Sequence, residues 1–469
     1  MILGPVLACI AIVAVAGLLL KEYHPHAVLL VAGLVMLLAA ELLGLQAPAL
    51  DESTGFFGFD LFRHVTESFS GTLAGVGLMI MAIGGFVAMM DEIGASGALV
   101  RVATTPLRLL SRFPYVVAAL VIPIGQVLFV CIPSAAGLGL LLMASVFPLL
   151  VRVGVSRLTA VSAIVACTSF GMGPASAMSA KAAELVGMPL SNYFFLEQIP
   201  LAIPASVVMA GCLYATNRWF DARAGGAAAV DAASDHLLDD EDEEPDAADA
   251  PEVRAPAVYA VLPALPVVLL LLFSSLFALW DPPIVLDTTT AILISVAAAI
   301  AVHAFRLRDP KKTFGAVKVF WGGMGDIFKS VVTLIIAADL FARGLLALGL
   351  VDALVQVSQA LGAGAVVMGV LMATLIFLAS ILMGSGNASF FAFGPLVPKL
   401  AKDLGVSPEQ LLLPMQFSAS MGRSVSPIAG VVIATAGLGR VSSMDVARRT
   451  ALPLVLTLAF MLGWHHVVG

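Results

Sequence analysis

The second half of the chain repeats the polar interruptions of the first half at a constant spacing. Ser134 lies in the run PSAAGLG, and Ser385 lies 251 residues later in the run GSGNASF. At the same spacing, Gly154-Val155-Ser156 recurs as Gly405-Val406-Ser407. Paired Gly/Ser/Pro interruptions of apolar segments in matching halves are typical of secondary transporters, whose sites lie near the bilayer midplane. The repeat therefore predicts a chain that moves a small polar solute across a membrane.

Composition places the chain in a bilayer. Hydrophobic residues make up 60% of the 469 residues and charged residues only 12%, whereas the surface of a soluble protein is about a quarter to a third charged. Apolar runs such as 3–20, 27–45 and 258–277 are close to the ~20 residues with which a helix crosses the hydrocarbon core. The predicted fold class is an all-α polytopic membrane protein.

One acidic segment accounts for the net charge of −7. Residues 221–255 hold 12 of the 31 acidic residues but only two arginines, and they are poor in large apolar side chains. Such a composition predicts a disordered, solvated linker, which separates a first repeat (1–220) from a second (256–469). A regulatory or protein-binding role for this linker is the alternative.

The cysteines and the N-terminus indicate neither a metal site nor a cleaved leader. Cys9, Cys131, Cys167 and Cys212 are scattered over apolar segments without metal-ligand spacing, so free buried thiols are predicted. No cofactor is predicted. The first apolar run lacks a basic n-region and a small-residue cleavage site, which favours an uncleaved first helix.

Each repeat is predicted to contain five crossings and one re-entrant helical hairpin. In the first repeat, the hairpin spans about 115–152, and the crossings lie near 3–20, 27–45, 71–91, 158–187 (broken) and 193–217. In the second, the hairpin spans about 364–402, and the crossings lie near 257–278, 288–305, 320–345, 408–437 (broken) and 447–466. An odd number of crossings makes the second repeat enter the membrane from the opposite side, which defines an inverted repeat.

The basic residues orient this topology. Connections on the side of the acidic linker are rich in Arg and Lys, whereas 46–70 and 279–287 carry almost none. By the positive-inside rule the linker is cytoplasmic and both termini are extracytoplasmic. Lys399 and Lys402 are exceptions, because they come out on the outer side. Residues 94–112 combine apolar residues with arginines and suit a helix along the inner interface.

The two interruptions of the second half carry hydrogen-bonding groups and one cation. Residues 384–389 supply two glycines, two serines and Asn387 at a hairpin tip, where the free amides of a helix N-terminus favour an anion. Residues 418–427 add Arg423 and end at Pro427, which prevents an unbroken helix. A guanidinium at membrane depth is a functional candidate by default, and its planar fork suits a carboxylate.

Structural roles are the alternative for several of these residues. Small residues also let membrane helices pack closely, and Arg423 could belong to a structural ion pair. Thr168, Ser169 and Ser176 fit packing and function equally well. Two further pairs have helical spacing and could bind each other, Lys181 with Glu184 and Asp339 with Arg343; a proton relay is the alternative for Asp339.

The chain resembles the DcuC family of C4-dicarboxylate transporters, within a superfamily whose members carry opposed re-entrant hairpins. The likeness covers nearly the whole chain and is strongest at GSGNASFFAFGPLVPKLA and MGRSVSPIAGVVIATAG. It implies movement of succinate, fumarate or malate across the bacterial cytoplasmic membrane. It also implies a homodimer whose transport domain slides past a scaffold like an elevator. Exchange, uptake and efflux all remain open.

The substrate-binding residues predicted from the interruptions and the resemblance are Ser134, Gly137, Ser169, Ser176, Ser385, Gly386, Asn387, Ser389, Ser420, Arg423, Ser424 and Ser426. A coupling sodium ion could lie near Ser134, Ser385 and Asn387, and a proton is the other candidate. The first half departs from the family pattern, since Ala135-Ala136 replaces a hydroxyl and Pro174-Ala175-Ser176-Ala177 contains no acid. The particular substrate and the coupling ion therefore stay open, and a carrier of another small organic or amino-acid anion is the alternative.

Two rival functions are disfavoured. A passive channel has no need of inverted broken repeats, and counterflow separates it from a carrier. An intramembrane hydrolase needs a serine with a His or Asp base, or a metal. The histidines His303, His465 and His466 lie near helix ends, and no H-E-x-x-H run occurs. The chain is therefore predicted to be a transporter that binds a small solute and lipid, not an enzyme or a nucleic-acid-binding protein.

Overall fold

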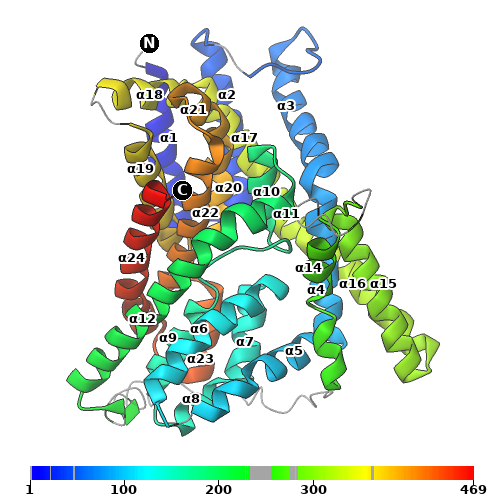
Figure 1. Ribbon diagram of the computed structural model, residues 1–469. Helices are drawn as coiled ribbons and strands as arrows, with labels where there is room; N and C mark the ends of the chain where they lie inside the picture. Colours follow the sequence, from blue (N-terminus) through cyan, green and yellow to red (C-terminus); the bar gives the residue numbers. More distant parts are fainter. Residues whose placement is uncertain are drawn as a thin grey trace.

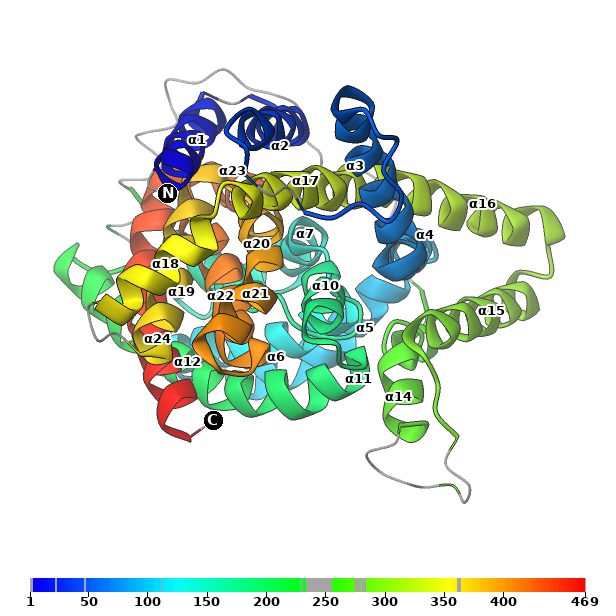
Figure 2. The same ribbon diagram turned by 90° about the horizontal axis from the view of Figure 1, so that it is seen from above.

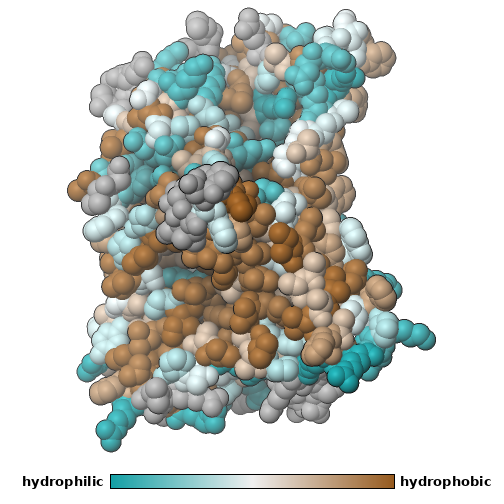
Figure 3. Space-filling model, turned by 45° about the vertical axis from the view of Figure 1, so that its right-hand side comes forward, coloured by the Kyte–Doolittle hydropathy of each residue, from teal (hydrophilic) through white to brown (hydrophobic). Residues whose placement is uncertain are grey.

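The structure is a computed structural model that describes residues 3–21, 23–45, 48–110, 112–227, 229, 231–232, 255–274, 280, 284–360 and 364–468. Helices are the only regular secondary structure in these ranges. Within them, 11 helices are long and apolar enough to cross a membrane. Apolar side chains form a broad band across the middle of the molecule, and hydrophilic residues gather toward its two ends (Figure 3). The predicted all-α membrane class is confirmed.

The first half begins with a group of long helices, shown from blue to cyan in Figure 1: α1 (Leu3–Leu20), α2 (Pro25–Leu42), α3 (Phe57–Thr72), α4 (Leu78–Glu92) and α5 (Ala95–Thr104). A π-helical turn, Leu73–Gly77, joins α3 to α4. A hairpin and a pair of shorter helices follow: α6 (Pro114–Cys131), α7 (Ala135–Ser145), α8 (Phe147–Arg152), α9 (Arg157–Ala166) and α10 (Ala177–Val186). The half closes with α11 (Leu190–Asn192), a second π-helical turn and α12 (Ile199–Arg223).

The second half follows the same order. Its first group contains α14 (Leu265–Leu272), α15 (Thr288–Leu307), α16 (Pro310–Ile327), α17 (Thr333–Ala347) and α18 (Leu350–Ala360), with a π-helical turn, Phe328–Val332, between α16 and α17. The hairpin and the remaining helices are α19 (Ala365–Met383), α20 (Gly386–Phe393), α21 (Val397–Leu404), α22 (Pro408–Val425), α23 (Gly430–Gly439) and α24 (Ser443–Val468). From above, α15 and α16 project from one side of the molecule, while α7, α10, α20 and α22 lie in its interior (Figure 2).

Helix boundaries in the two halves correspond because the same residue types start them. Ser134 precedes α7, and its Oγ accepts a hydrogen bond of 3.1 Å from the amide of Gly137. Ser385 precedes α20 and accepts one of 3.2 Å from the amide of Ala388. A serine at this position satisfies an amide that the first turn leaves free. The hydroxyl at each hairpin tip therefore starts the return helix.

Two predicted crossings are longer than the sequence indicates, and one is shorter. The helices expected near 71–91 and 320–345 belong to continuous segments over 57–92 and 310–347. The crossing expected near 257–278 is instead a 3₁₀ turn, Ala257–Val261, followed by the eight-residue α14. Pro263 lies in the turn between them, and Pro266 is the second residue of α14, a position at which proline favours the start of a new helix. Residues 275–279 and 281–283 lie outside the described residues.

The boundary of the predicted linker falls later than the composition indicates. Helix α12 continues to Arg223, and Asp221 is fully buried rather than solvated. After the linker, the chain resumes against α5, where Arg101 donates a hydrogen bond of 2.9 Å to the carbonyl of Ala255. The residues 228, 230 and 233–254, which include most of the predicted linker, lie outside the described part.

Candidate functional site

Three segments from both halves converge around α22. Arg423 on α22 donates a hydrogen bond from Nη2 to the carbonyl of Thr168, in the interruption between α9 and α10. A Cβ atom at Gly171, in the same interruption, would come within 2.3 Å of the Ser420 hydroxyl. At the second hairpin tip, a Cβ atom at Gly386 would come within 2.7 Å of the Ala419 carbonyl. Glycine is therefore required at both contacts, since any side chain would push these segments apart.

Arg423 brings a positive charge to this convergence without an acidic partner. Among the residues that the structure describes, no carboxylate lies within 4.0 Å of its guanidinium, and its Nε has no hydrogen-bond partner. The guanidinium carbon lies 5.8 Å from the centre of the Phe129 ring. A cation at membrane depth without a counter-ion is unfavourable by several kcal/mol. The arrangement is consistent with a partner that arrives from outside the chain.

Three hydroxyl groups on α22 and on the first-half interruption that Arg423 contacts are also unpaired. Ser169, Ser418 and Ser420 are fully buried, and none of their Oγ atoms has a partner among the described residues. Leaving a buried polar group unsatisfied costs about 1–3 kcal/mol. Ser169 belongs to the first-half interruption, and Ser420 lies beside Gly171 of the same interruption, so these two hydroxyls lie where the halves meet. Bound water or a polar solute would satisfy them.

Other predicted site serines already have partners that hold the backbone. The Ser389 hydroxyl lies against the Ser380 hydroxyl and donates to the Gly386 carbonyl at 3.0 Å. Ser426 donates to the carbonyl of Ile381 at 2.7 Å, and Ser424 donates within α22 at 3.2 Å. Ser426 thereby satisfies a carbonyl in the last turn of α19, as membrane burial requires, whereas Ser389 and Ser424 bond back to carbonyls of their own helices.

Asn387 differs from those serines. It is partly buried, and its side-chain amide has no hydrogen bond to the described part of the chain. It lies in the first turn of α20, directly after Gly386. Its donor and acceptor are therefore available beside the hairpin tip.

The first-half residues of the predicted site occupy two places. Ser134 and Gly137 form the cap at the tip of the first hairpin, whose α7 packs on α23: a Cβ atom at Gly139 would lie 3.1 Å from the Thr435 methyl group. Ser176 caps α10 instead, accepting from the Ser179 amide at 3.5 Å. Ser169 and Ser176 belong to the interruption beside Arg423, whereas Ser134 belongs to the first hairpin.

A buried network of glutamines, which the sequence analysis missed, supports the first-half interruption. Gln416 donates to the carbonyl of Gly171 at 2.6 Å, and the amide of Gly173 donates to Gln198 at 2.9 Å. The two glutamines are bonded to each other at 3.1 Å, and Tyr193 donates to Gln416 at 2.9 Å. The network satisfies backbone groups that have left the helical form. The sequence signal for this network was the presence of two glutamines within apolar segments.

Both predicted helical ion pairs are present. Lys181 binds Glu184 at 2.5 Å, and Arg343 binds Asp339 at 3.0 Å. Lys399, one of the two exceptions to the charge rule, binds Asp352 on α18 at 2.7 Å. The positive charge of Lys399 is thus balanced by an acid on the neighbouring helix.

Two solved structures share this fold. The YdaH transporter of Alcanivorax borkumensis aligns over 95% of this chain and 99% of its own, with a TM-score of 0.60 and 17% identity. MtrF of Neisseria gonorrhoeae, described among antimetabolite efflux pumps, aligns over 95% of this chain and 96% of its own, with a TM-score of 0.61 and 13% identity. At such low identity these likenesses establish the fold.

Sequence comparison adds the family. Residues 3–465 match the family model described as DcuC, C4-dicarboxylate anaerobic carrier. A Vibrio cholerae protein named "Probable anaerobic C4-dicarboxylate transporter DcuC" is 34% identical, over 95% of this chain and 93% of its own length. The anaerobic C4-dicarboxylate transporter DcuC of Escherichia coli K12 is 31% identical, over 97% and 94%. The chain belongs to the DcuC family.

This membership confirms three predictions from the sequence. The resemblance to DcuC carriers is correct, the protein is a transporter rather than an enzyme, and it is a multi-pass protein of the bacterial inner membrane.

Proposed function

We propose that this chain carries C4-dicarboxylates of the succinate, fumarate and malate class by alternating access, with Arg423 as the anchor for one carboxylate. The observation that carries the proposal is the partly buried guanidinium of Arg423, which has an unpaired Nε and no carboxylate within 4.0 Å in the described structure. Arginine presents a planar set of donors that matches a carboxylate in a bidentate manner. A dianion would supply the missing negative charge from either side of the membrane.

The second carboxylate of such a substrate would lie toward the hairpin tip. The first turn of α20 begins at Gly386 and leaves amide groups that favour an anion. Asn387 adds a free side-chain amide there. The unpaired hydroxyls of Ser169 and Ser420 lie between the halves and would bind the middle of the molecule. Together these groups fit an anion with polar groups at both ends.

The proposed architecture is a pair of inverted repeats. The continuous segments α3–α4 and α16–α17 each contain a π-helical turn. They run in opposite vertical directions in Figure 1, which supports an inverted relation. The two hairpins with α9, α10, α22 and α23 would then form the moving transport domain. The long outer helices would form the scaffold of a homodimer.

One transport experiment tests the substrate class, the coupling ion and the mode of transport. Purified protein in sealed liposomes is loaded with unlabelled succinate, and uptake of labelled succinate is measured. Counterflow should occur with succinate, fumarate and malate, and should be much weaker with monocarboxylates. Stimulation by an imposed sodium or pH gradient identifies the driving ion, while a strict need for internal substrate identifies exchange.

The matched control separates binding by Arg423 from general damage. Arg423→Gln should abolish counterflow, whereas Arg448→Gln, which removes an arginine whose side chain is 74% exposed, should retain it. Counterflow with amino acids or other organic anions but not with dicarboxylates would replace the substrate class and keep the carrier mechanism.

A further inference from the structure

A second charged cluster lies between α3 and α17, separate from Arg423. Ser68 on α3 donates a hydrogen bond of 2.9 Å to Oδ2 of Asp339 on α17. Arg343, one turn further along α17, donates to the same oxygen at 3.0 Å. Its Nη1 also lies 4.0 Å from the carboxylate of Glu67. Two carboxylates from the two helices therefore share one arginine.

A buried histidine completes the cluster. His64 lies one turn before Ser68 on the same face of α3 and is only 3% exposed. Its Nδ1 has no partner among the residues described. His64 also lies three residues before Glu67, so the imidazole and the Glu67 carboxylate share one face of α3. An unpaired ring nitrogen so deeply buried is unfavourable unless it takes part in binding something.

The cluster carries one uncompensated negative charge while the imidazole is neutral, because Glu67 and Asp339 face Arg343 alone. The side chains of Glu67 and Asp339 are only 17% and 23% exposed, and an unpaired charge is unfavourable where it is partly removed from water. A single proton, on His64 or shared with Glu67, balances the charge. One added positive charge therefore makes the cluster of Glu67, Asp339 and Arg343 neutral.

A proton fits this place better than a metal cation does. Arg343 already binds Asp339 and lies 4.0 Å from Glu67, and sodium prefers a shell of oxygen ligands to an imidazole nitrogen. No group of three or more His, Cys, Asp or Glu side chains able to hold a metal occurs in the described ranges.

The neighbouring charged side chains of Arg63, Glu52 and Asp60 are already engaged, and Asp51 contributes a backbone amide. The Asp51 amide donates to Glu67 at 3.0 Å, Arg63 binds Glu52 at 2.5 Å, and Asp60 accepts from Ser53 at 2.6 Å. On α2, which also packs against α17, the titratable groups are His26 and Glu41 at its opposite ends, and α20 carries none. The contact with the exposed segment 48–56 gives water a route to Glu67.

The cluster is also connected to the second hairpin through packed aromatic side chains. On α17, Phe341 lies between Asp339 and Arg343 in sequence, and its ring packs edge-on against Phe393 of α20, with centroids 6.2 Å apart. A change in how α3 and α17 bind each other would therefore reach the hairpin that bears Ser385 and Asn387.

We propose that His64, Glu67, Asp339 and Arg343 form a binding site for one proton, and that its occupancy is coupled to movement of the anion. This inference rests on the proposed transport function. It assigns proton binding to the outer helix pair, away from the substrate-binding residues, and it makes the cluster the sensor of an imposed pH gradient.

The test uses full-length protein in sealed liposomes without sodium. Two rates are measured, succinate counterflow at equal pH and net succinate uptake driven by a pH gradient. In His64→Gln, counterflow should stay within about twofold of wild type while gradient-driven uptake falls by about tenfold or more. His24→Gln, which alters an exposed histidine, should retain both rates. Glu67→Gln removes the excess charge and should uncouple transport in the same way, so it serves if His64→Gln does not fold.

Several outcomes would overturn the proposal. Gradient-driven uptake that survives in both variants excludes the cluster, and uptake driven only by a sodium gradient excludes a proton. Wild-type protein without any counterflow would instead refute the proposed function. Proton binding is then tested directly by nitrogen NMR of histidine-labelled protein. His64→Gln should remove one titrating resonance, and Glu67→Gln should change the pH at which that resonance titrates; if neither occurs, the site is absent.

Discussion

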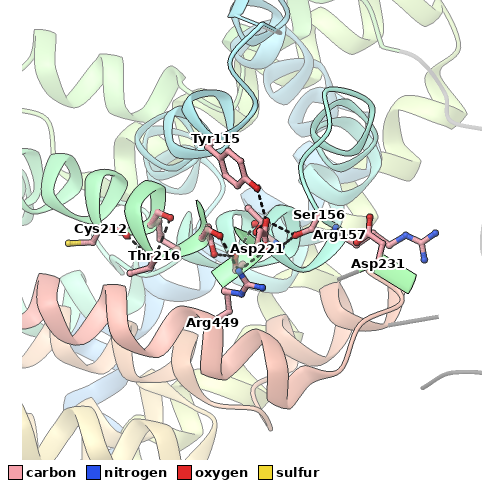
Figure 4. Close-up of polar contacts among 12 residues, drawn as sticks. Tyr115, Ser156, Arg157, Cys212, Thr216, Asp221, Asp231 and Arg449 are labelled. Carbon is pink, nitrogen blue, oxygen red and sulfur yellow. Dashed lines mark hydrogen bonds and ion pairs between the residues drawn. The ribbon is translucent and has the colours of Figure 1, made fainter. Parts of the chain in front are cut away.

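Arg449 on α24 donates a hydrogen bond of 2.8 Å to the carboxylate of Asp221 on α12, and both side chains are buried. The other carboxylate oxygen of Asp221 accepts from Ser156, Thr159 and Tyr115 at 3.0, 2.9 and 3.1 Å (Figure 4). The ion pair thus joins the C-terminal end of α12 to α24 and to the starts of α6 and α9. The carboxylate of Asp221 accepts from all four side chains.

Asp221→Asn should therefore lower stability strongly. The variant leaves the buried Arg449 charge without a counter-ion, which costs about 3–5 kcal/mol. The apparent melting temperature in detergent should fall by many degrees. The exposed pair Arg448–Asp445, 3.5 Å apart, offers the matched control. Asp445→Asn should change stability by no more than about 1 kcal/mol, and equal losses from both variants would contradict a special role for Asp221.

Arg423 variants should separate charge from geometry. Arg423→Lys keeps the charge but loses the bidentate fork, so weak transport with relaxed selectivity is expected. Arg423→Gln should lose binding of dianions while the protein stays folded. Succinate binding to purified Arg423→Gln is the decisive measurement. Wild-type affinity there would move the anion site to the amides of the hairpin tips.

Gly171→Ala should disturb the contact between the halves. The added methyl group would meet the Ser420 hydroxyl and the end of Met178, each at 2.3 Å. Such overpacking costs about 1–3 kcal/mol and should reduce succinate affinity by displacing Ser420. Gly211→Ala is the control, since its Cβ would meet nothing within 4 Å. Normal affinity in Gly171→Ala would show that Ser420 does not contact the substrate.

Two variants at the second hairpin tip should weaken binding by different routes. Asn387→Ala removes a side chain without a partner in the described structure. The loss of a hydrogen bond to a charged ligand is worth about 1.5–3 kcal/mol, which corresponds to about one to two decades in affinity. Ser385→Ala also removes the cap of α20, so stability should fall by about 1 kcal/mol as well. Binding measurements with melting curves distinguish the two effects, and unchanged binding in both variants would return the tip to a packing role.

The acidic linker should be removable only in part. Asp221 is buried, and Asp231 accepts a hydrogen bond of 2.8 Å from the Arg157 amide at the start of α9. Deletion of 233–254 should therefore preserve transport, whereas deletion from 221 should destabilise the protein. In a variant without reactive native cysteines, Ser234→Cys should resist an impermeant thiol reagent in intact cells and react in inverted vesicles. Labelling of intact cells would reverse the predicted orientation.

The sequence by itself determined the features that depend on interactions between residues close together in the chain. Apolar length predicted a membrane protein, and the serines at the hairpin tips marked where α7 and α20 begin. The pairs Lys181–Glu184 and Asp339–Arg343 were also predictable, because residues three or four apart share one face of a helix. Where local signals were mixed, the prediction was wrong: Pro263 and Pro266 interrupt the helix expected over 257–278.

Only the tertiary structure decided which distant groups meet. Arg423 reaches the carbonyl of Thr168, 255 residues away, and Gln198 reaches Gln416, 218 residues away. Neither contact follows from helical spacing, because the packing of whole helices sets the neighbours across an interface. For the same reason the sequence alone predicts that Asp221 lies in a solvated linker. Its neighbours in the sequence are acidic, but the arginine that binds it lies on the distant helix α24.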